Sequence, residues 1–255
     1  MKKILLTGIS VMFFGLTNAQ DTKSTGKNIE FGAKAGLNLS MIKASKDGDS
    51  KMKAGFHVGG VVEFKFSDKI GLQPELMYSQ EGGKYEYVGV VSPSVYNSEQ
   101  DITLSKIILP VMFKYYVIEG LSIEAGPQLD YIISAKSDNN VTVVGSSGAI
   151  MYDVDMDDNP GTVVVRQDDG SMDSARIYHD YGLNKLNFGF NLGAGYKLPM
   201  GLFFQARYNL GLTDFVDNGD FMSGTVEGTT SPIDANRMGN SMKNSNLQIS
   251  VGYKF

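Results

Sequence analysis

The 255-residue chain has no cysteine, a formal net charge of −5 and a charged fraction of 20%. The absence of cysteine excludes a disulfide framework, a thiolate zinc centre and a lipid anchor attached to cysteine. The mildly acidic balance argues against a nucleic-acid partner, which needs a basic face. Composition therefore leaves two candidate classes, an exported soluble protein and a membrane β-barrel.

The first residues have the pattern of a secretory signal peptide. Met1-Lys2-Lys3 is a short basic start, and residues 4–16 form an apolar run. Thr17-Asn18-Ala19 then supplies small or polar residues before a cleavage site between Ala19 and Gln20. The apolar run is too short to cross a bilayer as a helix, which takes roughly 20 residues. We therefore expect this segment to be removed on export.

The mature chain contains eight segments in which apolar and polar residues alternate. The last one shows the pattern most simply, because residues Leu247 to Phe255 alternate strictly and end on an aromatic residue. A period of two is that of a pleated strand. Each segment is long enough for a tilted membrane strand of ~9–11 residues. The predicted strands are residues 31–40, 55–66, 70–78, 104–116, 121–135, 185–198, 201–212 and 247–255.

The connections between these segments alternate in length. Outer-membrane barrels show this asymmetry, with short turns in the periplasm and longer loops outside. Because the number of predicted strands is even, both termini lie on the short-turn side. The short turns are 67–69, 117–120 and 199–200, and the long links are 41–54, 79–103, 136–184 and 213–245.

Aromatic residues of the predicted strands gather near both rims, as expected for rings at the two interfaces of a bilayer. Together with the loop asymmetry, these belts predict an all-β fold: an eight-stranded antiparallel up-and-down transmembrane β-barrel with short periplasmic turns and long extracellular loops. The belt near the long loops contains Phe56, Tyr78, Tyr131, Phe188 and Tyr208. The belt near the short turns contains Phe64, Phe66, Tyr115, Tyr196, Tyr253 and Phe255.

Three prolines lie inside the predicted strands. Pro74, Pro110 and Pro127 each lack the N–H that a strand ladder requires. We expect β-bulges to accommodate them.

The polar faces of the predicted strands point into a narrow lumen that side chains fill. Isolated charges there would be costly, whereas paired and hydrogen-bonded charges are tolerated. Both signs are present, so we expect an interior ion-pair network that plugs the barrel; a proton or ion path is the alternative. The predicted network contains Lys34, Glu63, Glu75, Lys114, Glu124, Asp130 and Arg207, with Lys65 and Lys106 on the same inward face.

The third long link contains a run of alternating carboxylates. Asp153, Asp155, Asp157 and Asp158 have a spacing that can supply several oxygen ligands to calcium. The run departs from an EF-hand loop, because Asp158 stands where glycine is needed and Val164 where glutamate is needed. It is therefore a weak calcium candidate, and a solvated acidic hairpin is the alternative.

The two histidines of the chain, His57 and His179, are weak catalytic candidates. His179 lies near Ser171 and Ser174, but a catalytic triad is a geometric arrangement that sequence proximity does not establish. His57 lies on the polar face of its strand, where we expect a hydrogen-bonded lumen residue. The sequence therefore predicts no catalytic residue and no cofactor.

Three strand sequences resemble a known family. Residues 31–40 (FGAKAGLNLS) are similar to the first strand of the PorT-like outer-membrane β-barrel family of Bacteroidota. Residues 107–115 (IILPVMFKY) resemble its fourth strand, I-P-L-L-L-K-Y, and residues 124–128 (EAGPQ) resemble its fifth, which contains G-P. The resemblance implies an outer-membrane barrel, and a few relatives act in protein secretion or gliding. It implies no catalytic residues, because the shared motifs are strand and turn residues.

The sequence favours a non-enzymatic outer-membrane β-barrel that presents long surface loops and has a structural, adhesive or partner-docking role. Its domains would be a signal peptide (1–19), a periplasmic segment (20–30) and the barrel (31–255). The expected partners are outer-membrane lipid and lipopolysaccharide, together with envelope or secretion proteins. Functional alternatives are an accessory subunit of a secretion machine and a membrane-embedded lipid-modifying enzyme. The structural alternative is a soluble lipocalin-like carrier with an apolar cavity.

Overall fold

The computed structural model describes residues 29–44, 49–91, 94–145, 148–156, 162–166, 172–176, 184–215, 223–225, 232–234 and 242–255. The predicted signal peptide lies outside these residues. Within them, no helix has the length and apolar character to cross a membrane. The strands are β1 (Ile29–Ala44), β2 (Asp49–Lys51), β3 (Lys53–Lys65), β4 (Ile70–Val91), β5 (Ser94–Ile118), β6 (Leu121–Gly145), β7 (Gly148–Met156), β8 (Thr162–Arg166), β9 (Met172–Arg176), β10 (Leu186–Lys197), β11 (Leu202–Gly211), β12 (Ser223–Thr225), β13 (Pro232–Asp234) and β14 (Met242–Lys254).

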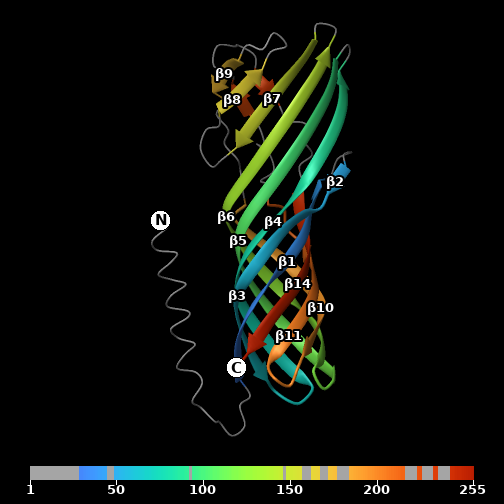
Figure 1. Cartoon of the computed structure of the whole chain (residues 1–255), viewed down its shortest axis with the longest axis vertical. Coiled ribbons are helices and arrows are strands. Elements are labelled where there is room, and N and C mark those ends of the chain that lie inside the picture. The colour runs from blue at the N-terminus through green and yellow to red at the C-terminus, as the bar shows by residue number, and fades with distance from the viewer. Residues whose placement is uncertain are drawn as a thin grey trace.

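Eight of these strands close into a ring (Figure 1). The ring order is β1, β3, β4, β5, β6, β10, β11 and β14, every neighbouring pair is antiparallel, and β14 pairs with β1 to complete the circle. The predicted eight-stranded antiparallel up-and-down barrel is confirmed. A ring of this kind leaves no strand edge within the membrane, where an unpaired backbone group would cost several kcal/mol.

Three short turns join strands at one rim, the same rim at which the C-terminus lies (Figure 1). The turn between β5 and β6 places Gly120 at φ +80°, and the turn between β10 and β11 places Gly201 at φ +96°. Glycine adopts this left-handed region without the steric cost of a Cβ atom. The glycines therefore allow the tight reversals that the sequence predicts at 117–120 and 199–200.

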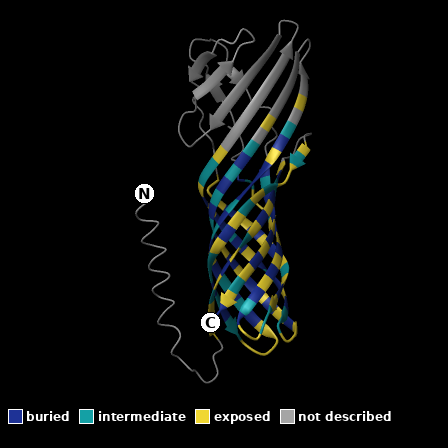
Figure 2. Ribbon diagram, viewed as in Figure 1, coloured by how far each residue is buried: buried dark blue, intermediate teal, exposed yellow. Residues whose placement is uncertain are grey.

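Side-chain exposure alternates along the barrel strands, which produces a chequered surface (Figure 2). Leu37 and Ile249 are exposed, whereas the adjacent Asn38 and Gln248 are buried. The apolar side chains thus cover the outside and the polar ones line the lumen. This distribution suits a barrel dissolved in lipid and is the reverse of a soluble carrier with an apolar cavity.

The strands on one side of the barrel are much longer than predicted. Residues 79–103 were expected to be a loop, but they form a continuous β4–β5 hairpin that reaches the pair Val91 and Ser94. Residues 136–145 likewise continue β6 beyond the ring, and β7, β8 and β9 extend that sheet further (Figure 1). The prediction failed here because a strand outside lipid needs no continuous apolar face, so its alternation is weak.

The barrel boundary also differs from the expected one. β1 begins at Ile29, so Ile29 and Glu30 belong to the barrel and not to the expected periplasmic segment. At the other end, β14 begins at Met242 within the link expected at 213–245.

An apolar cluster closes the lumen on the side away from the short turns. Its buried members are Ile42, Ile102, Leu104, Ile132, Phe215 and Met242. β1 approaches β4 so closely here that a Cβ atom on Gly83 would lie 2.6 Å from the backbone nitrogen of Ile42. The amide of Gly82 donates to Ser40 Oγ at 2.7 Å across the same contact.

The three strand prolines leave the register of the ladders unchanged. Ladder pairs are interrupted beside Pro74 between β3 and β4, beside Pro110 between β4 and β5, and beside Pro127 between β5 and β6, and pairing resumes in the same register. The expectation of bulges at the prolines is therefore wrong. The register shifts between β5 and β6 fall at Ser105/Lys106 and at Tyr116/Ile118.

The outward apolar face generates a prediction about stability. Ile249 lies outward between Leu37 and Ala206 on the neighbouring strands, so Ile249→Arg places a charge against lipid. We expect this change to lower the free energy of unfolding by about 2–4 kcal/mol. Urea titration of the barrel refolded into lipid vesicles measures the effect.

Val88→Arg is the matched control, because Val88 is exposed on the part of β4 that extends beyond the ring. It should change the free energy of unfolding by no more than about 0.5 kcal/mol. Equal losses in the two variants would contradict the proposed lipid-facing surface.

Candidate functional site

The barrel lumen concentrates the ionisable side chains of the strands. Each strand has only two faces, and since one faces lipid, its charged residues are directed inward. Among the residues that the structure describes, the buried charged side chains comprise five cations and five carboxylates. The cations are Lys34, Lys106, Lys114, Arg207 and Lys254, and the carboxylates are Glu63, Glu75, Glu81, Glu124 and Asp130.

Arg207 is the centre of this arrangement. From β11 it donates to Glu75 on β4, with Nη1 2.9 Å from Oε2, and to Glu124 on β6, with Nη2 2.6 Å and Nε 2.9 Å from Oε2. β4 and β11 lie opposite each other in the ring, with three strands between them on either side. The Arg207–Glu75 ion pair therefore crosses the full width of the lumen.

The central ion pairs form a closed ring of five side chains, which we call the central ring: Lys34, Glu75, Arg207, Glu124 and Gln205. Lys34 Nζ lies 2.8 Å from Glu75 Oε2 and donates to Gln205 Oε1 at 3.2 Å. Gln205 Nε2 in turn donates to Glu124 Oε1 at 3.0 Å. Every member is almost fully buried, so each charge depends on its neighbours in the ring for compensation.

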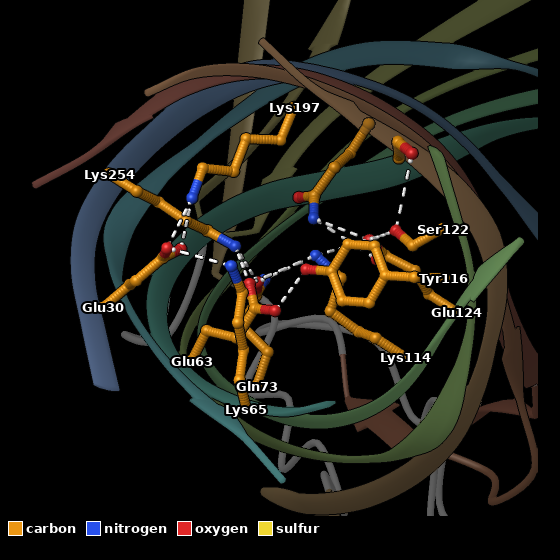
Figure 3. Close-up of polar contacts among 12 residues, drawn as sticks. Glu30, Glu63, Lys65, Gln73, Lys114, Tyr116, Ser122, Glu124, Lys197 and Lys254 are labelled. Carbon is orange, nitrogen blue, oxygen red and sulfur yellow. Dashed lines mark hydrogen bonds and ion pairs between the residues drawn. The ribbon is translucent and has the colours of Figure 1, made fainter. Parts of the chain in front are cut away.

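A second polar layer surrounds Glu63 and Gln73, and Figure 3 draws its contacts. Glu63 pairs with Lys254 and with Lys114, the latter at 3.4 Å, and accepts a hydrogen bond from Tyr116. Gln73 Oε1 accepts from Lys254 at 2.7 Å and from Lys114 at 3.3 Å. Two cations thus share one carboxylate and one amide oxygen.

Further contacts join this layer to its neighbours. Lys114 Nζ lies 3.2 Å from Glu124 Oε1, which links the second layer to the central ring. At the rim, Glu30 pairs with Lys65 at 3.0 Å and with Lys197 at 2.5 Å. The second layer is thus continuous with the central ring, and the rim cluster meets it where Lys65 Nζ lies 5.8 Å from the centroid of the Tyr116 ring.

A separate ionic cluster lies under the apolar cluster. Lys106 Nζ is 2.9 Å from Glu81 Oε2 and 3.4 Å from Asp130 Oδ2. Gln128 donates to Asp130 at 2.7 Å, and Asn244 donates to Glu81. Lys106 therefore pairs with two carboxylates, and the amide groups of Gln128 and Asn244 donate hydrogen bonds to the same two carboxylates.

His57 forms a hydrogen-bond relay in the same half of the lumen. Asn38 Nδ2 donates to the carbonyls of Phe56 and Gln80 at 3.0 and 2.8 Å, so its Oδ1 is the acceptor for His57 Nδ1–H at 2.8 Å. That tautomer leaves Nε2 to accept from Ser250 Oγ at 2.7 Å. A nucleophile, a base and an orienting group have this connectivity in hydrolases, but here all three side chains are buried in the lumen.

The structure places all seven residues of the predicted network in the lumen. Six of them form one connected set, and Asp130 lies in the cluster of Lys106. Sequence reasoning missed Glu81 because the strand was ended at Tyr78, although Glu75, Ser79 and Glu81 continue the same inward period. Lys254 was on the polar face of the terminal strand but was not included in the network.

The remaining candidates are only partly described. Asp153 and Asp155 lie on strand β7 and not in a loop, while Asp157 and Asp158 fall outside the described residues. Ser174 lies on β9, and Ser171 and His179 also fall outside. The described part of the chain holds no group of three or more side chains suited to a metal ion.

Several solved structures resemble this chain at low identity. Neisserial surface protein A is 13% identical with a TM-score of 0.41, over 90% of this chain and 100% of that one. Ail of Yersinia pestis, solved in complex with the heparin analogue sucrose octasulfate, is 10% identical with a TM-score of 0.40, over 90% and 100%. OprG of Pseudomonas aeruginosa is 11% identical with a TM-score of 0.38, over 90% and 97%.

Family membership comes from the sequence. No curated protein matches the chain. A protein-family model described as an outer membrane protein beta-barrel domain matches residues 18–217, a range that includes every barrel strand from β1 to β11. The chain therefore belongs to the outer membrane protein β-barrel domain family, and it is a protein of the outer membrane.

Proposed function

We propose that this protein is a non-enzymatic outer-membrane barrel whose lumen is closed to solutes, with a structural role in the envelope. Its outer strand extension, formed by β4, β5 and β6 beyond the ring, docks other envelope proteins. The observation that carries the closed lumen is the Arg207–Glu75 ion pair, which joins opposite walls of the barrel.

The balance of charge also supports closure over an ion path. A selective path needs a row of one sign or a continuous hydrated channel, whereas the buried cations and carboxylates in the described part of the barrel are equal in number and paired. The apolar cluster adds a dry barrier beyond the ionic layers. An eight-stranded barrel is narrow enough for side chains to fill it.

The same enclosure argues against the enzyme alternative. The Ser250–His57–Asn38 relay has the connectivity of an activated serine, but it lies between the central ring and the apolar cluster. A lipid substrate would reach the barrel from its outer surface. The relay therefore serves to satisfy buried polar groups.

The PorT-like resemblance and a place in a secretion machine belong to the docking part of the proposal. The β4–β5 hairpin and β6 extend far enough beyond the ring to be reached by a partner without disturbing the lumen (Figure 1). We include export through a cleaved signal peptide in the same proposal, because insertion into the outer membrane follows export.

Removing Arg207 tests the interior network. In Arg207→Met, Glu75 and Glu124 lose their shared cation while staying buried, so we expect the free energy of unfolding to fall by about 3–5 kcal/mol. Adding Glu75→Gln to this variant should recover part of the loss. Urea unfolding in vesicles measures all three proteins.

The control is Lys65→Gln, because the Lys65–Glu30 pair lies at the rim with the lysine side chain 32% exposed. Its effect should stay below about 1 kcal/mol. A loss at Lys65 as large as that at Arg207 would show that the central ring has no special importance.

Conductance tests closure directly. We expect the wild-type protein in a planar bilayer to give no stepwise current, because the central ring and the apolar cluster block the axis. The triple variant Glu75→Gly, Glu124→Gly and Arg207→Gly removes the ring, and its baseline should become leaky to small ions. Stepwise current from the wild-type barrel would overturn the closed-lumen proposal.

Shortening the outer hairpin tests docking. Tyr87 and Ser98 are cross-strand partners, so Asn-Gly can replace residues 88–97 without a change of register. Affinity purification of the tagged full chain from detergent-solubilised outer membranes should recover envelope proteins that the shortened chain loses. Asp68→Asn in the short turn at the opposite rim serves as the control and should keep them.

Recovery of secretion components by the full chain alone would support the secretion alternative. Recovery of nothing but lipid by both chains would contradict docking and leave the structural role.

A further inference from the structure

Two lysines face each other across the β1–β14 junction. Lys43 and Lys243 are direct cross-strand partners. Their neighbours Ile42 and Met242 are buried in the apolar cluster inside the barrel, so alternation turns both lysines outward. Directly opposed side chains have Cβ atoms about 4.5–5.5 Å apart, and like charges at that separation are destabilising.

A second pair of opposed lysines shows how the chain compensates such a contact. Lys51 on β2 and Lys84 on β4 are also cross-strand partners. Lys51 Nζ lies 2.5 Å from Glu86, and Lys84 Nζ lies 3.3 Å from Asp101. The hydrogen bond to Glu86 raises the pKa of Lys51. Each of these lysines therefore pairs with a carboxylate, although Asp101 also pairs with Lys53.

Lys43 and Lys243 have no such compensation within the described part of the chain, where neither forms an ion pair. The two pairs differ in their surroundings. Lys51 and Lys84 lie beside carboxylates of β4 and β5, whereas Lys43 and Lys243 lie at the long-loop end of the β1–β14 junction. A negatively charged group of the surrounding bilayer would supply the counter-charge.

The lower part of the column is apolar. Along the β1–β14 junction the outward pairs Ala33–Tyr253, Ala35–Val251, Leu37–Ile249 and Leu39–Leu247 precede Met41–Ser245, in which Ser245 is buried, and then Lys43–Lys243. Leu39 and Leu247 are each 39% exposed. The two cations thus stand at the long-loop end of a lipid-facing stripe, at the height where acyl chains give way to headgroups.

We propose that Lys43 and Lys243 together bind the phosphate of an anionic lipid in the outer leaflet. The two ammonium groups share one phosphate, whose negative charge removes their mutual repulsion. The exposed leucines beneath them contact the acyl chains of the same lipid. The site is independent of the closed lumen and of the docking role, since it lies on the outer wall.

Native mass spectrometry of the folded full chain in detergent tests this site, with diphosphoryl lipid A as the probe. We expect Lys43→Gln/Lys243→Gln to weaken lipid A binding about thirty-fold, because each lysine near a charged lipid surface contributes about 1 kcal/mol. Lys43→Arg/Lys243→Arg should keep the affinity. Slower migration of heated relative to unheated samples on gels checks that every variant is folded.

The matched control is Lys51→Gln/Lys84→Gln, which removes the same charge from a pair that carboxylates already compensate. Its affinity for lipid A should stay within about two-fold of wild type. Equal weakening in both double variants would show diffuse attraction and overturn the site, as would no weakening in Lys43→Gln/Lys243→Gln. Competition by millimolar inorganic phosphate that abolishes lipid A binding would identify a free-anion site and overturn the lipid assignment.

Discussion

A chain in lipid has no water to satisfy its backbone, and this constraint determines the rest of the structure. It requires a closed ring, which β14 completes by pairing with β1. A closed ring gives each strand one face toward lipid and one toward the lumen, so the polar side chains point into the lumen. The buried ions then require partners, and the central ring of Arg207, Glu75, Glu124, Lys34 and Gln205 provides them.

Sequence alone predicted the fold because the lipid-facing strands obey a strict two-residue period. Leu247 to Phe255 shows that period directly, and it also directs residues such as Arg207 and Glu75 inward. Beyond Tyr78 the outward positions are no longer apolar, although the inward period continues to Glu81, and for this reason Glu81 and the hairpin to Val91 were assigned to a loop. Which inward residues pair could not be derived, because Arg207 reaches Glu75 across the lumen and strand order alone does not give that distance.

The interior and the outer wall use charge in different ways. Inside, the buried cations and carboxylates of the described residues are equal in number and pair with each other. Outside, Lys51 and Lys84 pair with Glu86 and Asp101, whereas no ion pair of Lys43 or Lys243 is found among the described residues, and we propose a lipid phosphate as their partner. The strand prolines have only a local effect. Each one interrupts one ladder, and the register on both sides of the interruption is kept.

The spacing of the ion-pair partners along the chain has a consequence for assembly. Glu63 and Lys254 are 191 positions apart, and Glu75 and Arg207 are 132 apart. A nascent barrel that lacks β11 and β14 therefore leaves Glu75 without Arg207 and Glu63 without Lys254, and these incompletely compensated carboxylates hinder its entry into hydrocarbon. Full compensation arrives only with the last two strands of the ring, so insertion of this protein should be all-or-none, with partly built intermediates retained on the aqueous side.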